Sequence, residues 1–349
     1  MMNAHVRTEA SEAARPASSL LEVKNLTTEF RTERGTVRSL HSVSFGLGEG
    51  EALGLVGESG CGKSVTALSI MGLLPQPAGR IVSGEILFNG VDLTKLSDRE
   101  MEAVRGKDIA LIFQDALTSL NPVLTIERQI TEAARRHLGL SPAAARRRAI
   151  EFLDLVGIPA PDKRISDYPH QFSGGMRQRV MIAMALVCGP RLLIADEPTT
   201  ALDVTIQAQI LELLQRLRKE LSMALIMITH DLGVVAGIAD RVNVMYAGHV
   251  VETGMVRQIF KNASHPYTAG LLGSIPKLDS IRGSKLQSIK GTPPDLANPP
   301  PGCPFTPRCS HAFDKCAEPP PRSSPEPAHA AECWLLEAGV NTADSRGLS

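Results

Sequence analysis

The chain has 349 residues, of which 43% are hydrophobic, so it is long enough for two domains and too apolar for global disorder. Its 37 basic and 37 acidic residues balance, and we therefore expect no nucleic-acid partner. The longest apolar run, at residues 180–190, is too short to span a bilayer, and the first residues lack the apolar core of a signal peptide. These features predict a soluble or peripheral, cytoplasmic protein with a disordered tail over residues 1–18.

The first predicted elements are three short strands and a helix, at residues 20–23, 41–45, 52–56 and 65–74. Between the third strand and the helix, the sequence GESGCGKS fits the pattern G-x-x-x-x-G-K-[ST]. This context predicts a phosphate-binding loop, because backbone N–H groups and the helix N-terminus attract anions. We expect Lys63 to reach the β- and γ-phosphates and Ser64 to ligate magnesium. The predicted loop residues are Gly57, Glu58, Ser59, Gly60, Cys61, Gly62, Lys63 and Ser64, with Cys61 at an unconstrained position.

An apolar strand at residues 109–113 ends at Gln114, and residues 126–156 follow a helical pattern rich in alanine and arginine. The lack of strand-like alternation in this stretch indicates a helical insertion. Gln114 is either an ordinary polar strand end or a side chain that reaches magnesium and the attacking water.

A second glycine-rich turn, Ser173-Gly174-Gly175-Met176, enters another helix and predicts a second phosphate-binding surface. The two surfaces cannot both serve one nucleotide. The turn is therefore expected to face the ATP of a partner, which predicts dimerisation.

A buried strand at residues 192–195 leads into Asp196 and Glu197, and the strand MALIMI at residues 223–228 is followed by His230. The helical pattern between these strands makes a strand–helix–strand unit and predicts a parallel α/β sheet. We expect Asp196 to hold magnesium and Glu197 to orient or deprotonate the attacking water. The alternatives are a pair of carboxylates that caps a turn and a structural histidine.

Residues 242–246 and 249–252 predict a hairpin, and after about residue 275 proline clusters predict a loop-rich C-terminal region. This region contains four cysteines with the spacing C-x5-C-x6-C-x16-C, namely Cys303, Cys309, Cys316 and Cys333. Thiols or a metal site are expected rather than disulfides. The spacing lacks a short C-x2-C pair and matches no usual ferredoxin run, so it leaves metal binding and scattered thiols open.

These motifs, in this order, resemble those of the nucleotide-binding subunits of ABC transporters. Gly57–Ser64 resembles the Walker A motif, Gln114 the Q-loop glutamine, and residues 172–176 the ABC signature, with Phe172 and Met176 departing from the common LSGGQ. Asp196 and Glu197 resemble the end of Walker B and its catalytic glutamate, Ala201-Leu202-Asp203 the D-loop, and His230 the switch histidine. The family also stacks an aromatic residue on adenine, for which Phe30 is the candidate; its alternative is a core residue.

The stretches FQDALTSLNP (113–122), HPYT (265–268) and GCPFTPRC (302–309) are similar to those of the oligopeptide/dipeptide importer ATPases. The resemblance implies an α/β P-loop NTPase fold: a RecA-like core with an antiparallel β subdomain and a helical subdomain, plus a loop-rich, cysteine-containing C-terminal extension. The implied domains are an ABC ATPase over residues 19–260, with its helical subdomain at about 115–170, and the C-terminal region over 261–349. The implied cofactors are ATP, Mg²⁺ and a [4Fe–4S] cluster on the four cysteines, with zinc as second choice.

The resemblance further implies an ATPase, bound to the cytoplasmic face of the membrane, that powers peptide import. Its implied partners are two permease subunits, which the helical subdomain would contact, a second, similar ATPase subunit and an external solute-binding protein. Nickel chelates or glutathione are alternative cargoes. A soluble ABC protein of DNA repair or translation is a rival, but the chain has one cassette and no heptad run. A non-hydrolysing subunit is another rival, disfavoured by Lys63, Asp196, Glu197 and His230.

Overall fold

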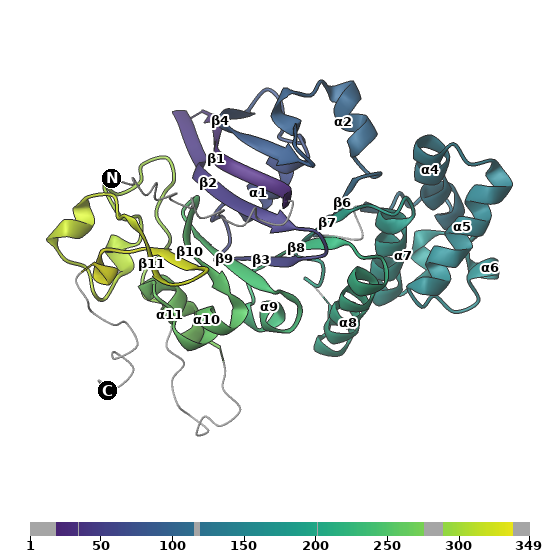
Figure 1. Cartoon of the computed structure of the whole chain (residues 1–349). Helices are drawn as coiled ribbons and strands as arrows, with labels where there is room; N and C mark the ends of the chain where they lie inside the picture. Colours follow the sequence, from purple (N-terminus) through teal and green to yellow (C-terminus); the bar gives the residue numbers. More distant parts are fainter. Residues whose placement is uncertain (1–18, 34, 115–118, 201, 276–288, 338–349) are drawn as a thin grey trace, which may run out of the picture.

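The computed structural model describes residues 19–33, 35–114, 119–200, 202–275 and 289–337. The predicted disordered tail over residues 1–18 lies outside the described residues. Two sheets organise the fold, one of eight strands and one of four (Figure 1). No helix in the described ranges combines the length and apolarity required to cross a membrane.

The eight-stranded sheet has the order β11-β12-β10-β9-β3-β8-β7-β6. Neighbouring strands pair in parallel from β9 through β3, β8 and β7 to β6, and antiparallel from β9 outward to β11. β3 and β8 are buried along their whole length, as expected for parallel strands covered on both faces. The strands are β3 (Ala52–Val56), β6 (Ile109–Ile112), β7 (Leu192–Asp196), β8 (Ala224–Thr229), β9 (Arg241–Tyr246), β10 (His249–Met255), β11 (Arg322–Glu326) and β12 (His329–Glu332).

The smaller sheet is antiparallel, with the order β2-β1-β4-β5, and lies on one side of the large sheet (Figure 1). Its strands are β1 (Ser19–Thr32), β2 (Gly35–Gly48), β4 (Gly79–Phe88) and β5 (Val91–Asp92). The strands predicted at residues 20–23 and 41–45 are therefore parts of longer strands, which bulges interrupt. Helix α1 (Lys63–Ile70) packs with this sheet in one apolar core, and helix α2 (Asp98–Val104) starts at a capping box made by Ser97 and Glu100.

A group of helices stands at the β6 end of the large sheet (Figure 1). The stretch predicted as helical over 126–156 forms two helices, separated at Gly139, which has a left-handed φ of 63°. Small residues such as Ala134 and Ala149 are fully buried where these helices and α7 share one core, so alanine allows close packing. The helices are α4 (Ile126–Leu138), α5 (Pro142–Leu155), α6 (Pro161–Arg164) and α7 (Gly174–Leu186).

The remaining helices are α8 (Val204–Glu220), α9 (Leu232–Ile238), α10 (Val256–Lys261) and α11 (Pro266–Gly273). The predicted hairpin is confirmed as β9 and β10, with Ala247 and Gly248 in left-handed conformations at its turn. In the C-terminal region, short 3₁₀ turns lie at Thr306–Arg308, Asp314–Ala317 and Trp334–Leu336. The predicted loop-rich region contains, in addition, the strands β11 and β12, which form a hairpin that extends the large sheet.

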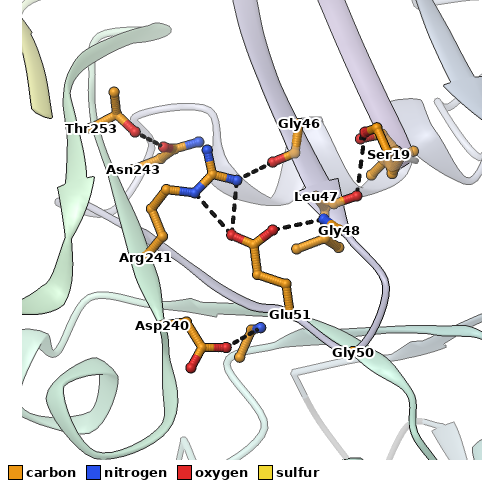
Figure 2. A network of polar contacts seen from close by, with 12 residues as sticks. Ser19, Gly46, Leu47, Gly48, Gly50, Glu51, Asp240, Arg241, Asn243 and Thr253 are labelled. Atoms are coloured by element: carbon orange, nitrogen blue, oxygen red, sulfur yellow. Dashed lines mark hydrogen bonds and ion pairs between the residues drawn. The ribbon is translucent and has the colours of Figure 1, made fainter. Parts of the chain in front are cut away.

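A polar network joins the two sheets (Figure 2). Arg241, at the start of β9, donates from Nε to Glu51 Oε1 at 2.9 Å and also bonds the carbonyl of Gly46 in β2. Glu51 in turn accepts the backbone N–H of Gly48 at 2.7 Å. The carboxylate of Asp240 accepts the N–H of Ala52 at 2.8 Å, so the start of β3 is fixed by side chains from a distant segment.

A buried carboxylate anchors the C-terminal hairpin to the body. Glu252 in β10 is 1% exposed and accepts the backbone N–H groups of Ser264 at 2.7 Å and His265 at 2.9 Å. Its Oε1 also lies 2.7 Å from Nε2 of His329 in β12, a side chain that is likewise 1% exposed. One residue thereby ties β12 and the segment before α11 to the sheet.

Glu252→Ala is expected to lower the free energy of unfolding by about 3 kcal/mol or more, because it leaves buried donors without an acceptor. Urea or thermal unfolding of the full chain measures the change. Glu102→Ala is the matched control, since Glu102 makes only an exposed ion pair with Arg136 and should cost less than about 1 kcal/mol. Equal effects of the two substitutions would contradict the anchoring role of Glu252.

Candidate nucleotide-binding site

A cavity of about 690 Å³ lies where the phosphate-loop segment meets the ends of β7 and β8. Polar groups that the sequence places far apart converge on it, from the loop after β3, the end of β6, the end of β7 and the end of β8. Its lining residues are Ser39, Glu58, Ser59, Gly60, Gly62, Lys63, Ser64, Val65, Gln114, Glu197, His230, Leu271, Ser274 and Ile289.

The loop between β3 and α1 requires glycine at two positions. Gly57 has a φ of 155°, and a Cβ there would lie 2.2 Å from the carbonyl oxygen of Met245. Gly62 has a φ of 107°, and its Cβ would lie 2.9 Å from the carbonyl oxygen of Ser39. Neither contact can relax cheaply, because the obstructing atoms belong to the backbone. The glycines of the motif thus serve the packing of the loop against β2 and β9.

Lys63, the first residue of α1, is buried, and its amine lies against the backbone of the phosphate loop. Its Nζ donates to the carbonyl oxygens of Gly57 at 2.8 Å and Glu58 at 3.0 Å. Cys61 is buried, with its sulfur 4.0 Å from the same amine, and burial raises the pKa of its thiol. Of the predicted loop residues, Gly57 and Cys61 do not line the cavity, and the others do.

The end of β7 places Asp196 beside the start of α1. The Ser64 hydroxyl beside it favours the charged carboxylate, but burial outweighs this effect and raises the pKa of Asp196. Oδ1 of Asp196 is buried and has no hydrogen-bond partner within the described part of the chain. A buried carboxylate oxygen without a donor, next to a serine hydroxyl, is the kind of oxygen ligand set that suits a divalent cation such as Mg²⁺.

Glu197 follows in a left-handed conformation with a φ of 46°, which is uncommon for a residue other than glycine. Its N–H donates to the carbonyl of Ile228 at 2.9 Å, so β8 fixes the turn. Its carboxylate lies 3.3 Å from Nδ1 of His230 and accepts from Nε2 of Gln114 at 3.3 Å and from the hydroxyl of Thr200 at 3.0 Å. Three segments thus hold one carboxylate at the cavity.

The serine–glycine turn before α7 lies on the exposed surface, apart from the cavity. Ser173 caps α7 by accepting the N–H of Met176 at 3.4 Å, and both Ser173 and Gly174 are exposed. A Cβ on Gly175 would lie 2.8 Å from Ile206 of α8, so glycine permits the close contact of these helices. No residue of this turn lines the cavity of its own chain.

Two further candidates also lie apart from the cavity. Asp203 caps α8, its Oδ1 accepting the N–H of Ile206 at 3.0 Å, and its neighbour Ala201 lies outside the described residues. Phe30 in β1 packs its ring over Gly79 in β4 and is not among the lining residues. The structure therefore does not bring Phe30 to the cavity.

Sequence reasoning missed the wall that the C-terminal region adds to this cavity. Leu271 and Ser274, in and after α11, and Ile289 line it together with the loop. Thr200 and Ser39 were missed as well. Of these residues, only Thr200 could have been found from the sequence, because its hydroxyl lies three positions after Glu197. The residues of the C-terminal wall could not, because their place at the cavity depends on how distant segments pack.

The four C-terminal cysteines surround a second, very small cavity of about 10 Å³, beside Phe305 and Trp334. None of the four forms a disulfide. Burial raises the pKa of the thiols of Cys303, Cys309 (to about 11) and Cys333 (to about 12), and the neighbouring cysteines add to each shift. Among the described residues, no group of three or more His, Cys, Asp or Glu side chains is arranged to hold a metal ion. The described residues thus give no support to the predicted [4Fe–4S] cluster or to zinc as its alternative.

Comparison with known proteins places the chain in a family. Residues 40–200 match the model of the ABC transporter family, and residues 251–316 match that of the oligopeptide/dipeptide transporter C-terminal region. The chain is 55% identical to the dipeptide transport ATP-binding protein DppD of Bacillus subtilis, covering 91% of this chain and 95% of that one. It is 51% identical to the oligopeptide transport ATP-binding protein OppD of Salmonella typhimurium, covering 93% and 96%.

Solved structures agree with the fold. The ATP-binding cassette MJ0796, in a dimeric post-hydrolysis state bound to ADP and phosphate, superposes with a TM-score of 0.61 at 28% identity, covering 68% of this chain and 99% of that one. The protein cbiO1 of Clostridium perfringens, described as part of the ABC transporter complex cbiONQ, gives a TM-score of 0.60 at 29% identity, covering 70% of this chain and 91% of that one. The predicted P-loop NTPase fold is thereby confirmed. The chain belongs to the ATP-binding proteins of the oligopeptide/dipeptide group of ABC transporters, and it is an ABC ATPase.

Proposed function

We propose that this chain hydrolyses ATP to power the import of di- or oligopeptides through a membrane ABC transporter. One observation carries the hydrolytic part: Gln114 and His230, from separate strands, bracket the Glu197 carboxylate on the cavity that also holds Lys63. The names of relatives more than 50% identical over nearly their whole length support peptide cargo.

The proposed roles follow from these positions. The loop residues 57–64 bind the phosphates of ATP, with Lys63 as the cation for the β- and γ-phosphates. Glu197 accepts a proton from the attacking water or orients it, while Gln114 and His230 hold the Glu197 side chain at the γ-phosphate end. Ser64, Asp196 and Gln114 would hold Mg²⁺, which when bound neutralises charge on the phosphates.

The exposed Ser173-Gly174-Gly175 turn is proposed to face the ATP of a second ATPase subunit, with Asp203 near the same interface. Its absence from the lining of its own cavity supports this assignment, as does the dimeric state of the similar cassette MJ0796. We further propose that the partner ATPase is similar but not identical.

Membrane attachment is proposed to occur through two permease subunits at the cytoplasmic face, with the helical subdomain of about residues 115–170 as the contact. Exposed Val123 and Phe113 flank the Gln114 segment and support this assignment. An external solute-binding protein would deliver the cargo to the permeases. Under this proposal, residues 19–260 form the ATPase domain and residues 261–349 the C-terminal region.

The cargo is tested with the purified complex in proteoliposomes. Stimulation of ATP hydrolysis is compared for a dipeptide, a pentapeptide, glutathione and a nickel chelate, each presented with the solute-binding protein. Peptides are expected to give the largest stimulation. Stimulation by glutathione or the nickel chelate alone would replace the peptide assignment while leaving the ATPase intact.

Glu197→Gln is expected to bind ATP but lower kcat about 100-fold or more, because the amide cannot accept a proton from water. The slowed protein should accumulate as an ATP-bound dimer in size-exclusion chromatography with the partner subunit. Glu220→Gln, at the exposed end of α8, is the control and should keep wild-type activity. Near-normal ATP hydrolysis in Glu197→Gln would refute the assignment.

Asp196→Asn is expected to abolish ATP hydrolysis yet raise the Tm of the magnesium-free, nucleotide-free protein near pH 7. Burial raises the pKa of Asp196, so its charged form destabilises the fold, and the neutral amide removes that cost. The difference in Tm should shrink as the pH falls towards the carboxyl pKa, where the wild-type side chain takes up a proton. Asp162→Asn, at an exposed position, provides the control, and a lower Tm for Asp196→Asn would contradict the argument.

We also propose, on family resemblance, that Cys303, Cys309, Cys316 and Cys333 hold a [4Fe–4S] cluster. The four cysteines supply the ligand type and number of such a cluster, and all four line one cavity. Zinc ranks second, because the family resemblance favours the cluster; the geometry of the described residues supports neither. When bound, the cluster would supply structural cross-links to a loop-rich region.

Iron and acid-labile sulfide, measured on anaerobically purified protein, test this assignment. Equal amounts of the two are expected in the wild type, with both lost and the Tm lowered in Cys309→Ser. Cys188→Ser, in the core behind α7, should retain both. Colourless, metal-free protein with unchanged stability would exclude the cluster, and stoichiometric zinc would select the alternative.

A further inference from the structure

The C-terminal region binds Glu58, the second residue of the phosphate loop. Two side chains from separate segments of that region bind this residue, Arg308 from the cysteine-containing segment and Tyr267 from α11. They are 250 and 209 residues away from Glu58 in the sequence. The contact therefore depends on the tertiary fold alone, and it has no part in the sequence motifs or in the proposed hydrolysis of ATP.

Arg308 makes a two-pronged ion pair with the Glu58 carboxylate. Its Nη1 lies 2.6 Å from Oε2 and its Nη2 lies 2.9 Å from Oε1. The arginine side chain is only 4% exposed and also donates to Tyr246 Oη at 3.3 Å and to the carbonyl of Lys290 at 3.0 Å. The hydrogen bond to Glu58 raises the arginine pKa further, so the cation is held in place.

Tyr267 binds the backbone of the same residue. Its Oη accepts the N–H of Glu58 at 2.8 Å, and its ring is fully buried. The ring packs at 4.6 Å from that of Tyr246 and at 5.4 Å from that of Phe305, measured between ring centroids. The aromatic cluster thus fixes where the second residue of the phosphate loop lies.

Glu58 matters because it is the acidic residue of the loop and lines the cavity beside Lys63. A free carboxylate there would repel the phosphates of ATP and compete for the lysine amine. The ion pair with Arg308 neutralises this charge and turns both carboxylate oxygens toward the C-terminal region. The hydrogen bond to Tyr267 removes freedom from the backbone between Gly57 and Ser59.

We propose that Arg308 and Tyr267 are positioning residues of the ATP site, through which the folded C-terminal region sets the affinity of the phosphate loop for ATP. The inference rests on the placement of ATP at residues 57–64 proposed above. It requires no metal at the four cysteines. Arg308 then acts on ATP only through Glu58, and the C-terminal region contributes to ATP binding.

Binding of the fluorescent analogue mant-ATP to the full chain is the first measurement. Arg308→Ala is expected to raise its Kd at least about five-fold, with Arg308→Lys in between because lysine keeps the charge but loses the two-pronged geometry. Arg322→Ala is the matched control, since Arg322 lies in the same C-terminal region but pairs with Glu332. Its Kd should equal that of the wild type.

A second substitution separates the electrostatic role from a merely structural one. Adding Glu58→Gln to Arg308→Ala removes the uncompensated carboxylate and is expected to bring the Kd back towards the wild-type value. In the assembled transporter, Arg308→Ala should raise KM for ATP by a similar factor while kcat stays within about two-fold. A structural role alone predicts no rescue by Glu58→Gln.

Tyr267→Phe covers the case in which Arg308→Ala does not fold, as judged by circular dichroism. It keeps the ring and removes the acceptor of the Glu58 N–H, and a raised Kd for mant-ATP is expected. Wild-type Kd values in both Arg308→Lys and Tyr267→Phe would overturn the proposal. Failure of the wild-type chain itself to bind mant-ATP would instead count against the proposed nucleotide site.

Discussion

The site depends on one constraint, the alignment of neighbouring parallel strands. β3, β8 and β7 pair in register, so their carboxyl ends meet at the same edge of the sheet. The phosphate loop follows β3, His230 follows β8, and Asp196 and Glu197 end β7. Residues more than a hundred positions apart therefore share a cavity because three strands end together, as is general for ligand sites of α/β sheets.

The same edge concentrates unusual backbone conformations. Gly57, Gly62 and Glu197 all have positive φ, and the two glycines lie where a Cβ would strike the backbone of β2 or β9. Glu197 keeps this conformation without being glycine, because its N–H bond to the carbonyl of Ile228 fixes it, and its proposed role requires the carboxylate. The strain is local, and the surrounding hydrogen bonds from Gln114 and Thr200 hold the side chain in place.

Much of this arrangement could be predicted from the sequence, because the informative residues are adjacent in the chain. The phosphate loop, the Asp196-Glu197 pair and the β9–β10 hairpin are local patterns, and the structure places each at the predicted point of the fold. The prediction of helix over residues 126–156 is correct in kind, but the structure has two helices separated at Gly139. The sequence did not reveal this boundary, because one glycine within an alanine-rich stretch leaves the helical periodicity unchanged. Contacts between distant segments had no such local pattern. Neither the β11–β12 extension of the sheet nor the pairing of Arg308 with Glu58 follows from any spacing.

Phe30 illustrates the limit most directly. Phe30 is an aromatic residue before the loop, as the family resemblance requires, yet its ring packs on Gly79. The apolar lining of the cavity comes from Val65, Leu271 and Ile289. Two of these three residues belong to the C-terminal region. That region thus contributes both apolar surface and, through Arg308, charge compensation to a cavity that is also lined by Glu197, directly after β7. The C-terminal region makes this contribution within one chain, whereas the exposed Ser173 turn does not line the cavity of its own chain. Under the function proposed above, completion of the site therefore depends on a partner subunit. An ATPase partner lacking such a region would therefore build its own phosphate loop on different supports, and the two composite sites of a heterodimer would differ in nucleotide affinity for a structural reason.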